Sequence, residues 1–309
     1  MTRSNPLGIN LSFCVKRWVT PQLWAGIVRD QLDLDLVQFS FDLVDPMWPN
    51  AILSRHACDI AKVTQDHGIT IHSAFIGLAH YTFNQLLHPD EAVRDYAEFW
   101  LERAYGFAAE AGIQGVGGPL GAIASRLDGT EAEALDQRDY EGLIERMLRL
   151  GRKARAAGLR ELYVEPTPMR REWPWTIQQS RQMMDDLQAS DTPWRLCVDW
   201  GHGTVLPLYG MPEGPLSGPG ADPMEPWFAQ LHDVIAAVHI QQTDFQSDCH
   251  WDFTVPGRVD PGQARSLLAR TGLAQSPVLL EVFYPFERDS RSILDALKAS
   301  ALSLKQAFA

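Results

Sequence analysis

Short apolar segments alternate along the chain with longer segments whose apolar residues recur every three or four positions. Most of the apolar segments are continuous runs, which is typical of parallel strands buried on both faces. Eight of them are predicted strands: Leu7–Phe13, Leu34–Phe41, Ile69–Phe75, Ile113–Gly117, Glu161–Glu165, Trp194–Asp199, Ile235–Ile240 and Val278–Phe283. The periodic segments are predicted helices: Pro21–Leu32, Pro49–His67, Asp90–Ala111, Asp139–Ala157, Thr176–Gln188, Pro223–His232, Pro261–Thr271 and Ser290–Ala307.

This alternation predicts an α/β fold, a (β/α)8 TIM barrel that forms a single domain over residues 1–309. Helix, glycine and strand follow one another at Gly68, Gly112 and Gly158, as in the αβ loops of parallel architectures. The alternative is a doubly wound sheet, but no GxGxxG follows the first strand. The Gly/Pro-rich segment Gly210–Pro226 is interpreted as a long loop after the sixth strand, either a lid or a subunit contact.

Composition narrows the class of partner. The chain has 39 acidic and 27 basic residues, a formal net charge of −12, which disfavours nucleic acid and anionic membrane surfaces. No apolar run approaches the roughly 18 residues of a membrane span, and the first residues do not resemble a signal peptide. The four cysteines are scattered without a CxxC pair, which predicts reduced thiols and a cytoplasmic location. We expect a small-molecule partner, with a homo-oligomer left open.

Ionisable residues occupy the carboxyl ends of four consecutive predicted strands. Glu165 ends the fifth in YVEPTP, Asp199 the sixth in CVDWGH, and His239 and Glu281 lie in AAVHIQQ and LLEVF. One such residue alone could cap a helix or bond to a core carbonyl. Three carboxylates packed together would repel one another and raise one another's pKa unless a cation neutralised them. The set therefore predicts one divalent metal ion. Oxygen donors with one imidazole favour Mn²⁺, Mg²⁺ or Co²⁺, with Zn²⁺ as an alternative.

With these residues the chain resembles the xylose isomerase-like barrel superfamily, near the ketose 3-epimerases, tetrulose-phosphate epimerases and D-apiose isomerase. The resemblance covers nearly the whole chain, and its specific part runs from Glu165 to Glu281. It implies that the four residues above are the metal ligands and that Glu165 and Glu281 exchange the substrate proton. It also implies that His202, three residues after Asp199, contacts the substrate. VPGRVD, residues 255–260, fits a further pattern of the superfamily.

The chain departs from the resemblance in two places. Gln241 and Gln242 follow the seventh-strand histidine where many relatives have Lys-Asp. Arg170, Arg171 and Glu172 occupy the region where the epimerases have a second polar contact after the fifth strand. The identity of the substrate therefore stays open at this point.

Further residues after the predicted strands are candidate substrate contacts. Lys16 and Arg17 follow the first strand, and Arg170 and Arg171 follow the fifth, where cations could anchor a phosphate. Surface salt bridges are the alternative interpretation. Trp side chains could pack on a sugar or belong to the core, and His72 of ITIHSAF could hold a hydroxyl or be a satisfied polar group. The candidate substrate-binding residues are His202, His72, Lys16, Arg17, Arg171, Trp200 and Trp251.

The function predicted from these residues is a metal-dependent isomerase or epimerase of small ketoses or aldose/ketose pairs. Proton transfer would proceed through an enediolate that the metal stabilises. A phosphorylated tetrulose or pentulose is favoured over a free sugar such as apiose. The alternatives are a metal-dependent dehydratase of the inosose type and a non-catalytic sugar-binding barrel. An apurinic-site endonuclease is disfavoured because it needs more metal ligands and a basic DNA-binding face.

Overall fold

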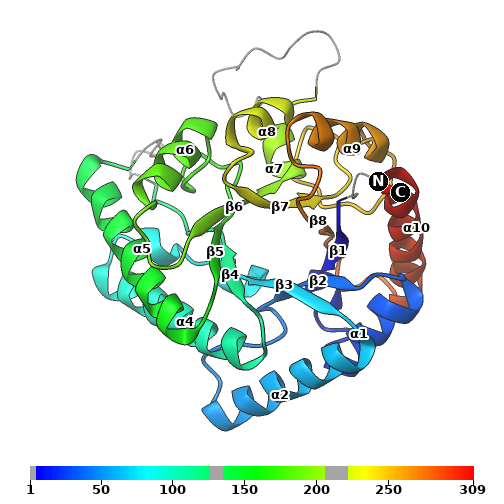
Figure 1. Ribbon diagram of the computed structural model, residues 1–309, viewed down its shortest axis with the longest axis horizontal. Coiled ribbons are helices and arrows are strands. Elements are labelled where there is room, and N and C mark those ends of the chain that lie inside the picture. Colours follow the sequence, from blue (N-terminus) through cyan, green and yellow to red (C-terminus); the bar gives the residue numbers. More distant parts are fainter. Residues whose placement is uncertain (1–4, 126–134, 206–221) are drawn as a thin grey trace. The chain divides into compact units, whose positions relative to one another are not determined.

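All eight predicted strands are present in the computed structural model, which describes residues 5–125, 135–205 and 222–309. They follow one another in chain order around a closed barrel with helices between them (Figure 1), so the predicted fold class is confirmed. The strands are β1 (Leu7–Asn10), β2 (Leu36–Ser40), β3 (Thr70–Phe75), β4 (Gly115–Gly118), β5 (Glu161–Val164), β6 (Trp194–Asp199), β7 (Ile235–Ile240) and β8 (Val278–Leu280).

The long helices also follow the predicted pattern. They are α2 (Asn50–His67), α4 (Glu91–Glu110), α5 (Gln137–Ala157), α6 (Ile177–Asp186), α8 (Glu225–Leu231), α9 (Pro261–Arg270) and α10 (Ser290–Phe308). Gly158 ends α5 in the left-handed conformation, with φ of 93°, which a residue without a Cβ adopts at no steric cost. The helix–glycine–strand pattern in the sequence thus marks true helix ends.

Several boundaries differ from the prediction because side chains or short helices end the regular pairing early. β1 stops at Asn10, whose side chain accepts a hydrogen bond from the Ser12 amide and caps the 3-10 helix η1 (Leu11–Cys14). The first predicted helix divides into α1 (Pro21–Gly26) and a π-helical turn, η2 (Ile27–Gln31).

Three short helical segments have no counterpart in the prediction. They are α3 (Leu78–Tyr81), the 3-10 helix η3 (Gln85–Leu87) and α7 (Trp200–Val205). They are too short for an apolar periodicity to develop, since one turn takes about 3.6 residues.

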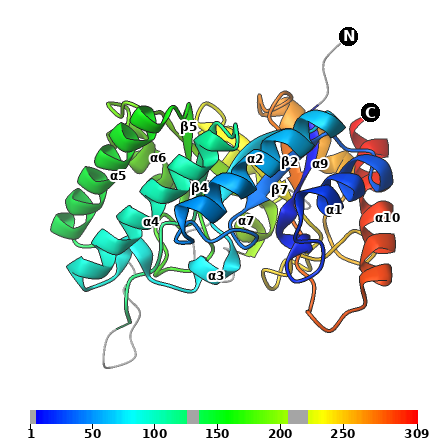
Figure 2. The same cartoon turned by 90° about the horizontal axis from the view of Figure 1, so that it is seen from below.

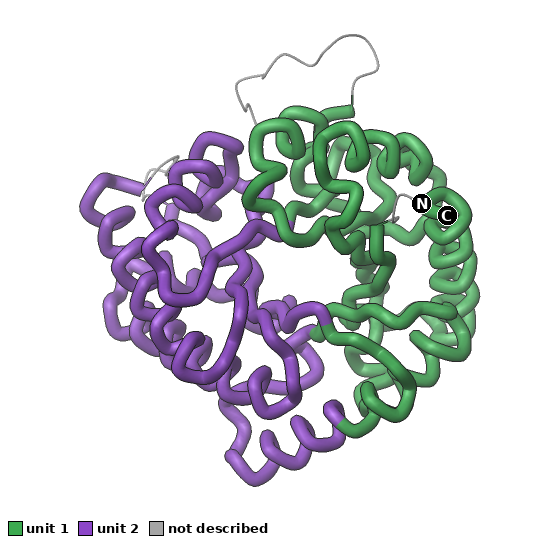
Figure 3. The backbone as a smooth tube through the Cα atoms, in the orientation of Figure 1, with its two compact units in different colours: residues 1–39, 62–71, 198–309 green, residues 40–61, 72–197 purple. Residues whose placement is uncertain are grey.

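The chain divides into two compact units (Figure 3). Unit 1 comprises residues 1–39, 62–71 and 198–309, and unit 2 comprises residues 40–61 and 72–197. Within unit 1, β7, β8, β1 and β2 pair in parallel, with His239 opposite Leu279 and Leu7 opposite Val278. The carboxyl ends of β7 and β8 are thereby brought to the same level.

Unit 2 holds parallel pairs from β3 to β6 and the two longest helices. α4 and α5 pack side by side (Figure 2). Between them, Glu98 of α4 is buried and contacts three cations of α5, at 3.2 Å to Arg146, 3.1 Å to Arg149 and 3.4 Å to Lys153. The cations offset the cost of burying the carboxylate. Burial alone would raise the pKa of Glu98, but the hydrogen bonds and charges of Arg149 and Lys153 lower it.

Two further expectations concern membrane-spanning helices and the long loop after β6. No helix among the described residues is both long and apolar enough to cross a bilayer. The predicted loop Gly210–Pro226 lies mostly outside the described residues, which resume at residue 222, so its interpretation as a lid or subunit contact stays a prediction.

Candidate metal centre

Three of the four predicted metal ligands lie together in unit 1. Asp199 is the last residue of β6, His239 is the fifth of the six residues of β7, and Glu281 directly follows β8. Their exposed fractions are 1%, 0% and 7%. The parallel strands bring these side chains to the same end of the barrel, which is the end where TIM-barrel active sites form.

His239 lies between the two carboxylates. Its Nδ1 is 2.9 Å from Oε2 of Glu281 and 3.7 Å from Oδ2 of Asp199. The other oxygen of Asp199, Oδ1, accepts hydrogen bonds from the His202 amide at 2.8 Å and from Nε2 of Gln241 at 2.7 Å. The Asp199 carboxylate is therefore held firmly through one oxygen, which leaves the other directed at the histidine and the glutamate.

Oδ2 of Asp199 is buried and has no hydrogen-bond partner among the described residues. Leaving a buried acceptor without a partner costs about 1–3 kcal/mol, and more when it is charged. A divalent cation would satisfy this oxygen, and the donors around it are two carboxylates and one imidazole, a set that hard and borderline divalent ions accept. These residues of unit 1 therefore fit a metal ion.

Glu165, the fourth predicted ligand, belongs to unit 2. It directly follows β5, is 6% exposed, and its amide donates to the Gly118 carbonyl at 3.2 Å. A carboxylate at the end of a barrel strand is costly to bury without a cation or a donor. Glu165 thus directly follows its strand, as Glu281 directly follows β8.

A second group of ionisable side chains adjoins the first in unit 1. His202 in α7 has its Nε2 3.2 Å from Asp248, and Nε2 of His250 is 3.1 Å from both oxygens of the same carboxylate. His250 also reaches Glu281, with its Nδ1 3.7 Å from Oε2. The donor atoms of His202, Asp248 and His250 are close enough together to hold a cation themselves.

The sequence reasoning found His202 but missed Asp248 and His250. Both lie in the segment after β7, in QSDCHWD, where an aspartate and a histidine are separated by one residue. That spacing beside the end of a strand is the signal that could have found them. Trp251, the next residue, holds this segment to the strand, because its amide and carbonyl pair with those of Gln242 at 3.1 and 2.8 Å.

Charge in this region shifts three pKa values. Burial alone would raise the pKa of Glu281 and of Asp248, but the neighbouring imidazoles outweigh it and hold both values below the ordinary range. Burial alone would lower the pKa of His250, but Asp248 above all, with Asp199 and Glu281, raises it to about 9. Both carboxylates are therefore ionised at neutral pH, as ligands or proton acceptors must be.

The polar side chains behind His239 were also missed. Its Nε2 is 2.7 Å from Oε1 of Gln38 in β2, and Nδ2 of Asn10 contacts Gln38 at 2.7 Å and Oε1 of Glu281 at 2.8 Å. Asn10 and Gln38 are almost completely buried, at 3% and 0% exposure. The available signal was an amide side chain in each apolar strand, the asparagine of LGIN and the glutamine of LVQFS.

The two cations predicted after β1, Lys16 and Arg17, differ in the contacts that they make. Nη2 of Arg17 donates to the carbonyls of Pro285 and Arg288 at 2.7 and 3.0 Å, so it links the segments that follow β1 and β8. Lys16 is exposed, and its Nζ lies 4.1 Å from the centre of the Phe286 ring. Lys16 is the cation of this pair that keeps its ammonium accessible to an anion.

The two tryptophans among the predicted substrate contacts, Trp200 and Trp251, differ in their burial. Trp200 is completely buried and meets Phe228 edge to face, with ring centres 5.2 Å apart. Its contacts are those of a core residue, which was the alternative interpretation. Trp251 is partly exposed beside His250.

Two candidates lie in unit 2. His72 in β3 has its Nδ1 2.9 Å from Oγ of Ser73, and its ring is 5.5 Å from that of Tyr163. The hydroxyl of Tyr163 in turn donates to the carboxylate of Glu161, the first residue of β5. His72 therefore packs against a tyrosine that is hydrogen-bonded at the beginning of β5. Arg171 is partly buried with Nη2 3.4 Å from Sδ of Met169. Whether either contacts substrate stays a prediction.

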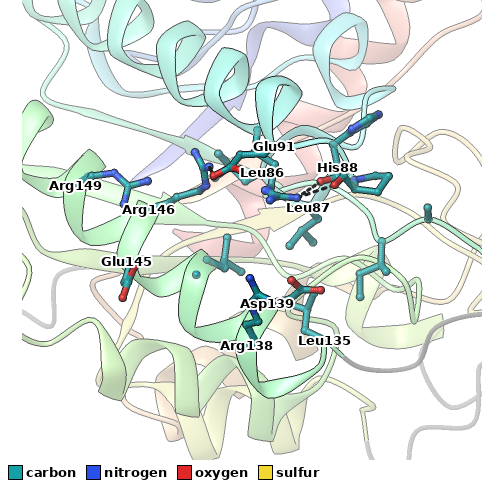
Figure 4. A pocket seen from close by; sticks show the side chains of 16 residues that line it. Leu86, Leu87, His88, Glu91, Leu135, Arg138, Asp139, Glu145, Arg146 and Arg149 are labelled. Carbon is teal, nitrogen blue, oxygen red and sulfur yellow. Dashed lines mark hydrogen bonds and ion pairs between the residues drawn. The ribbon is translucent and has the colours of Figure 1, made fainter.

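Unit 2 also contains a cavity of about 620 Å³ between the start of α4 and the first turns of α5 (Figure 4). Four arginines line it, Arg94, Arg138, Arg146 and Arg149. Arg146 and Arg149 are already engaged with Glu98, and Arg94 donates to two backbone carbonyls. None of the predicted site residues lines this cavity.

Comparison with known proteins extends these observations to the family. No family model matches the chain. A curated D-erythrulose 1-phosphate 3-epimerase from Brucella abortus is 24% identical over 303 residues, which are 95% of this chain and 93% of that protein. A solved structure from Rhodospirillum rubrum, named provisionally as a xylose isomerase, is 37% identical with a TM-score of 0.89 and covers 98% of this chain and 99% of its own.

A D-psicose 3-epimerase from Clostridium cellulolyticum, solved with D-tagatose, shares the fold, with a TM-score of 0.70 at 15% identity over 98% of this chain and 99% of that one. Three observations indicate the same family: the closed barrel, the ionisable residues at the ends of its strands, and the relative with 37% identity. The chain belongs to the xylose isomerase-like TIM-barrel superfamily of sugar isomerases and epimerases.

Proposed function

We propose that this protein is a divalent-metal-dependent epimerase of a small ketose, with a ketose phosphate as the favoured substrate. The observation that carries the proposal is the buried group of Asp199, His239 and Glu281, in which Oδ2 of Asp199 accepts no hydrogen bond from any described residue. An aspartate is stable in such a place when a cation completes its surroundings.

Glu165 is the proposed fourth ligand. It directly follows β5, Asp199 is the last residue of β6, and β5 and β6 pair in parallel. When bound, the ion supplies an electrophile that polarises a carbonyl and the adjacent hydroxyl of the sugar.

Glu281 and Glu165 are the proposed proton carriers. Epimerisation breaks the C–H bond next to the carbonyl, and the electron pair moves into an enediolate while a carboxylate takes the proton. A second carboxylate then returns a proton to the other face of the same carbon. Asn10 holds Oε1 of Glu281 and thereby aligns the carboxylate, and the neighbouring imidazoles lower the pKa of Glu281 and keep it ionised.

His202 is the proposed contact for a substrate hydroxyl. Its Nε2 lies 3.2 Å from the Asp248 carboxylate and 3.9 Å from that of Asp199, so the ring is anchored beside the ligand group. His250, on the other side of Asp248, shares that carboxylate. Together the two imidazoles and Asp248 offer donors and acceptors of the kind that bind sugar hydroxyls.

The phosphate preference rests on two observations. The relative from Brucella abortus is named for a tetrulose phosphate. Lys16, after β1, is exposed and has no carboxylate partner among the described residues, so its ammonium can bind an anion as a point charge. Arg17 supports this segment through the carbonyls that it binds.

The test is incubation of Mn²⁺-loaded protein with D-erythrulose 1-phosphate, free erythrulose and larger ketoses in D₂O. We expect deuterium at one carbon next to the carbonyl, together with the epimer of the sugar. Glu281→Gln should lose both, whereas the exposed Glu287→Gln serves as the matched control. A dehydrated product would instead identify a lyase. Absence of both exchange and product with every sugar would refute the proposal.

A further inference from the structure

The ring of His239 has a hydrogen-bonded side that faces away from the two carboxylates. There its Nε2 contacts Oε1 of Gln38, and Asn10 contacts both Gln38 and Glu281. All of these side chains belong to unit 1 and are buried. Because buried polar groups need matched partners, the direction of each bond in this group can be traced from one end to the other.

The trace begins at a group whose role is unambiguous. The backbone N–H of Ser12 can only donate, and it donates to the Asn10 side chain at 2.8 Å. The atom of Asn10 that accepts this bond is therefore its oxygen, Oδ1. The opposite atom is the amide nitrogen, which donates to Gln38 at 2.7 Å and to the Glu281 carboxylate at 2.8 Å.

The next two bonds follow from the first. Because Asn10 donates to Gln38, the Gln38 atom in that contact must be its carbonyl oxygen, Oε1. The same oxygen is 2.7 Å from Nε2 of His239. Two acceptors at that distance would repel each other, so Nε2 carries a hydrogen and donates it to Gln38. By the same reasoning, the 2.9 Å contact between Nδ1 and Oε2 of Glu281 requires a hydrogen on Nδ1 as long as no ion is bound. A metal ion at this place would displace that hydrogen, and the neutral ring would then keep its hydrogen on Nε2 and its lone pair on Nδ1.

Nδ1 is the atom that faces the candidate metal position. It lies 2.9 Å from Oε2 of Glu281 and 3.7 Å from the unpartnered Oδ2 of Asp199. A histidine binds a metal through the lone pair of a neutral ring, and the hydrogen bond made by its other nitrogen selects which nitrogen that is. The structure thus contains the acceptor that makes Nδ1 the available ligand atom.

We propose that Gln38 is a positioning residue that selects the Nε2–H tautomer of His239, with Asn10 fixing the direction of the Gln38 amide. This inference rests on the proposed metal site and adds the reason why its histidine is ready to bind an ion. Asn10 has a second effect, since the same amide nitrogen holds the Glu281 carboxylate. One asparagine thereby aligns two of the proposed ligands.

The first experiment measures Mn²⁺ affinity by calorimetric titration of the purified protein and three variants. Gln38→Met keeps the length of the side chain but removes the acceptor, so we expect affinity to fall about 10- to 100-fold. Gln38→Glu keeps an accepting oxygen in a side chain of the same shape and should stay within about threefold of the wild type. Gln85→Met is the matched control, because Gln85 is equally buried but its amide donates to the His80 carbonyl in unit 2.

The second experiment needs no substitution at Gln38 and therefore does not depend on a variant that folds. Protein labelled with ¹⁵N-histidine and loaded with Zn²⁺, a diamagnetic ion, is studied by long-range ¹H–¹⁵N NMR, with the His239 signals assigned from a His239→Gln variant. We expect a hydrogen on Nε2 and none on Nδ1. A hydrogen on Nδ1 in the loaded protein would overturn the inference, as would equal affinity losses in Gln38→Met and Gln38→Glu.

Failure of this inference can be distinguished from failure of the proposed function. If the wild type binds no Mn²⁺ stoichiometrically, the metal site itself is refuted, and the role of Gln38 with it. If the wild type binds Mn²⁺ and Gln38→Met binds it within about threefold, only the positioning role is refuted.

Discussion

Replacing Asp199 by asparagine should remove the stabilisation that a metal gives this protein while leaving the metal-free protein almost unchanged. The asparagine can keep Oδ1, which accepts from the His202 amide and from Gln241. Its Nδ2 would take the place of Oδ2, the buried oxygen without a hydrogen-bond partner among the described residues. The change therefore removes a charge and a ligand atom but no existing hydrogen bond.

The size of the metal effect follows from mass action and chain length. An ion that binds only the folded state stabilises it by about 2.7 kcal/mol when its concentration is 100 times its Kd. Unfolding entropy near the melting temperature is about 2.1 cal/mol/K per residue, or about 0.65 kcal/mol/K over 309 residues. The wild type should accordingly melt about 4 °C higher with Mn²⁺ than with EDTA.

The metal-free proteins should differ much less. An unpartnered buried acceptor is exchanged for an unpartnered buried donor, and repulsion between Asp199 and the nearby Glu281 carboxylate is relieved. These opposing effects should leave the free energy of unfolding within about 1 kcal/mol of the wild type, a shift of no more than about 2 °C.

The assay is thermal unfolding followed by circular dichroism, for the wild type and Asp199→Asn, each with EDTA and with Mn²⁺. Asp295→Asn, an exposed aspartate on α10, is the matched control and should keep the full rise. Equal rises in the wild type and Asp199→Asn would refute the assignment of Asp199 as a ligand. No rise in the wild type would refute the metal site.

Three further predictions concern catalysis, pH and substrate. Glu281→Gln keeps an oxygen for the Asn10 bond but loses the basic oxygen, so turnover and solvent isotope exchange should fall by about 100-fold or more, and near-normal exchange would exclude its role as a proton carrier. Burial lowers the pKa of His80 to about 4, so between pH 6.5 and 4 the unfolded chain binds a proton that the folded ring does not. The free energy of unfolding therefore falls as the pH is lowered through this range. The loss is at most about 3 kcal/mol, and less where solvent screens the ring. His80→Phe can keep the stack on Trp100, and its free energy of unfolding in urea should not show this loss at low pH. An unchanged acid dependence in the variant would contradict the prediction. Lys16→Ala should lower kcat/KM for a ketose phosphate about tenfold without affecting the free ketose, and equal effects on both substrates would argue against a phosphate contact.

Local pattern was sufficient to predict the barrel and the grouping of three candidate ligands in unit 1. Continuous apolar runs separated by amphipathic helices indicate parallel strands, and the carboxyl ends of such strands meet at one end of the barrel. Asp199, His239 and Glu281 each stand at that end of a predicted strand, and the structure brings them together. Their proximity follows from strand direction alone.

The strand ends and the short helices were beyond that reasoning. β8 stops at Leu280 and β1 at Asn10, although both apolar runs continue, because backbone pairing depends on the neighbouring strand and not on the run itself. α7 is only six residues long, yet it decides where His202 points. No periodicity can reveal a helix of fewer than two turns.

The partners of the ligand group were determined only by the tertiary structure. Gln38 and His239 are 201 positions apart in sequence, and Asn10 and Glu281 are 271 apart. A polar residue in an apolar strand shows in the sequence as an anomaly, but which atom it donates to depends on distances between strands. Hydrogen bonds act over about 3 Å, so only the folded chain decides which of these side chains aligns His239 and which holds Glu281.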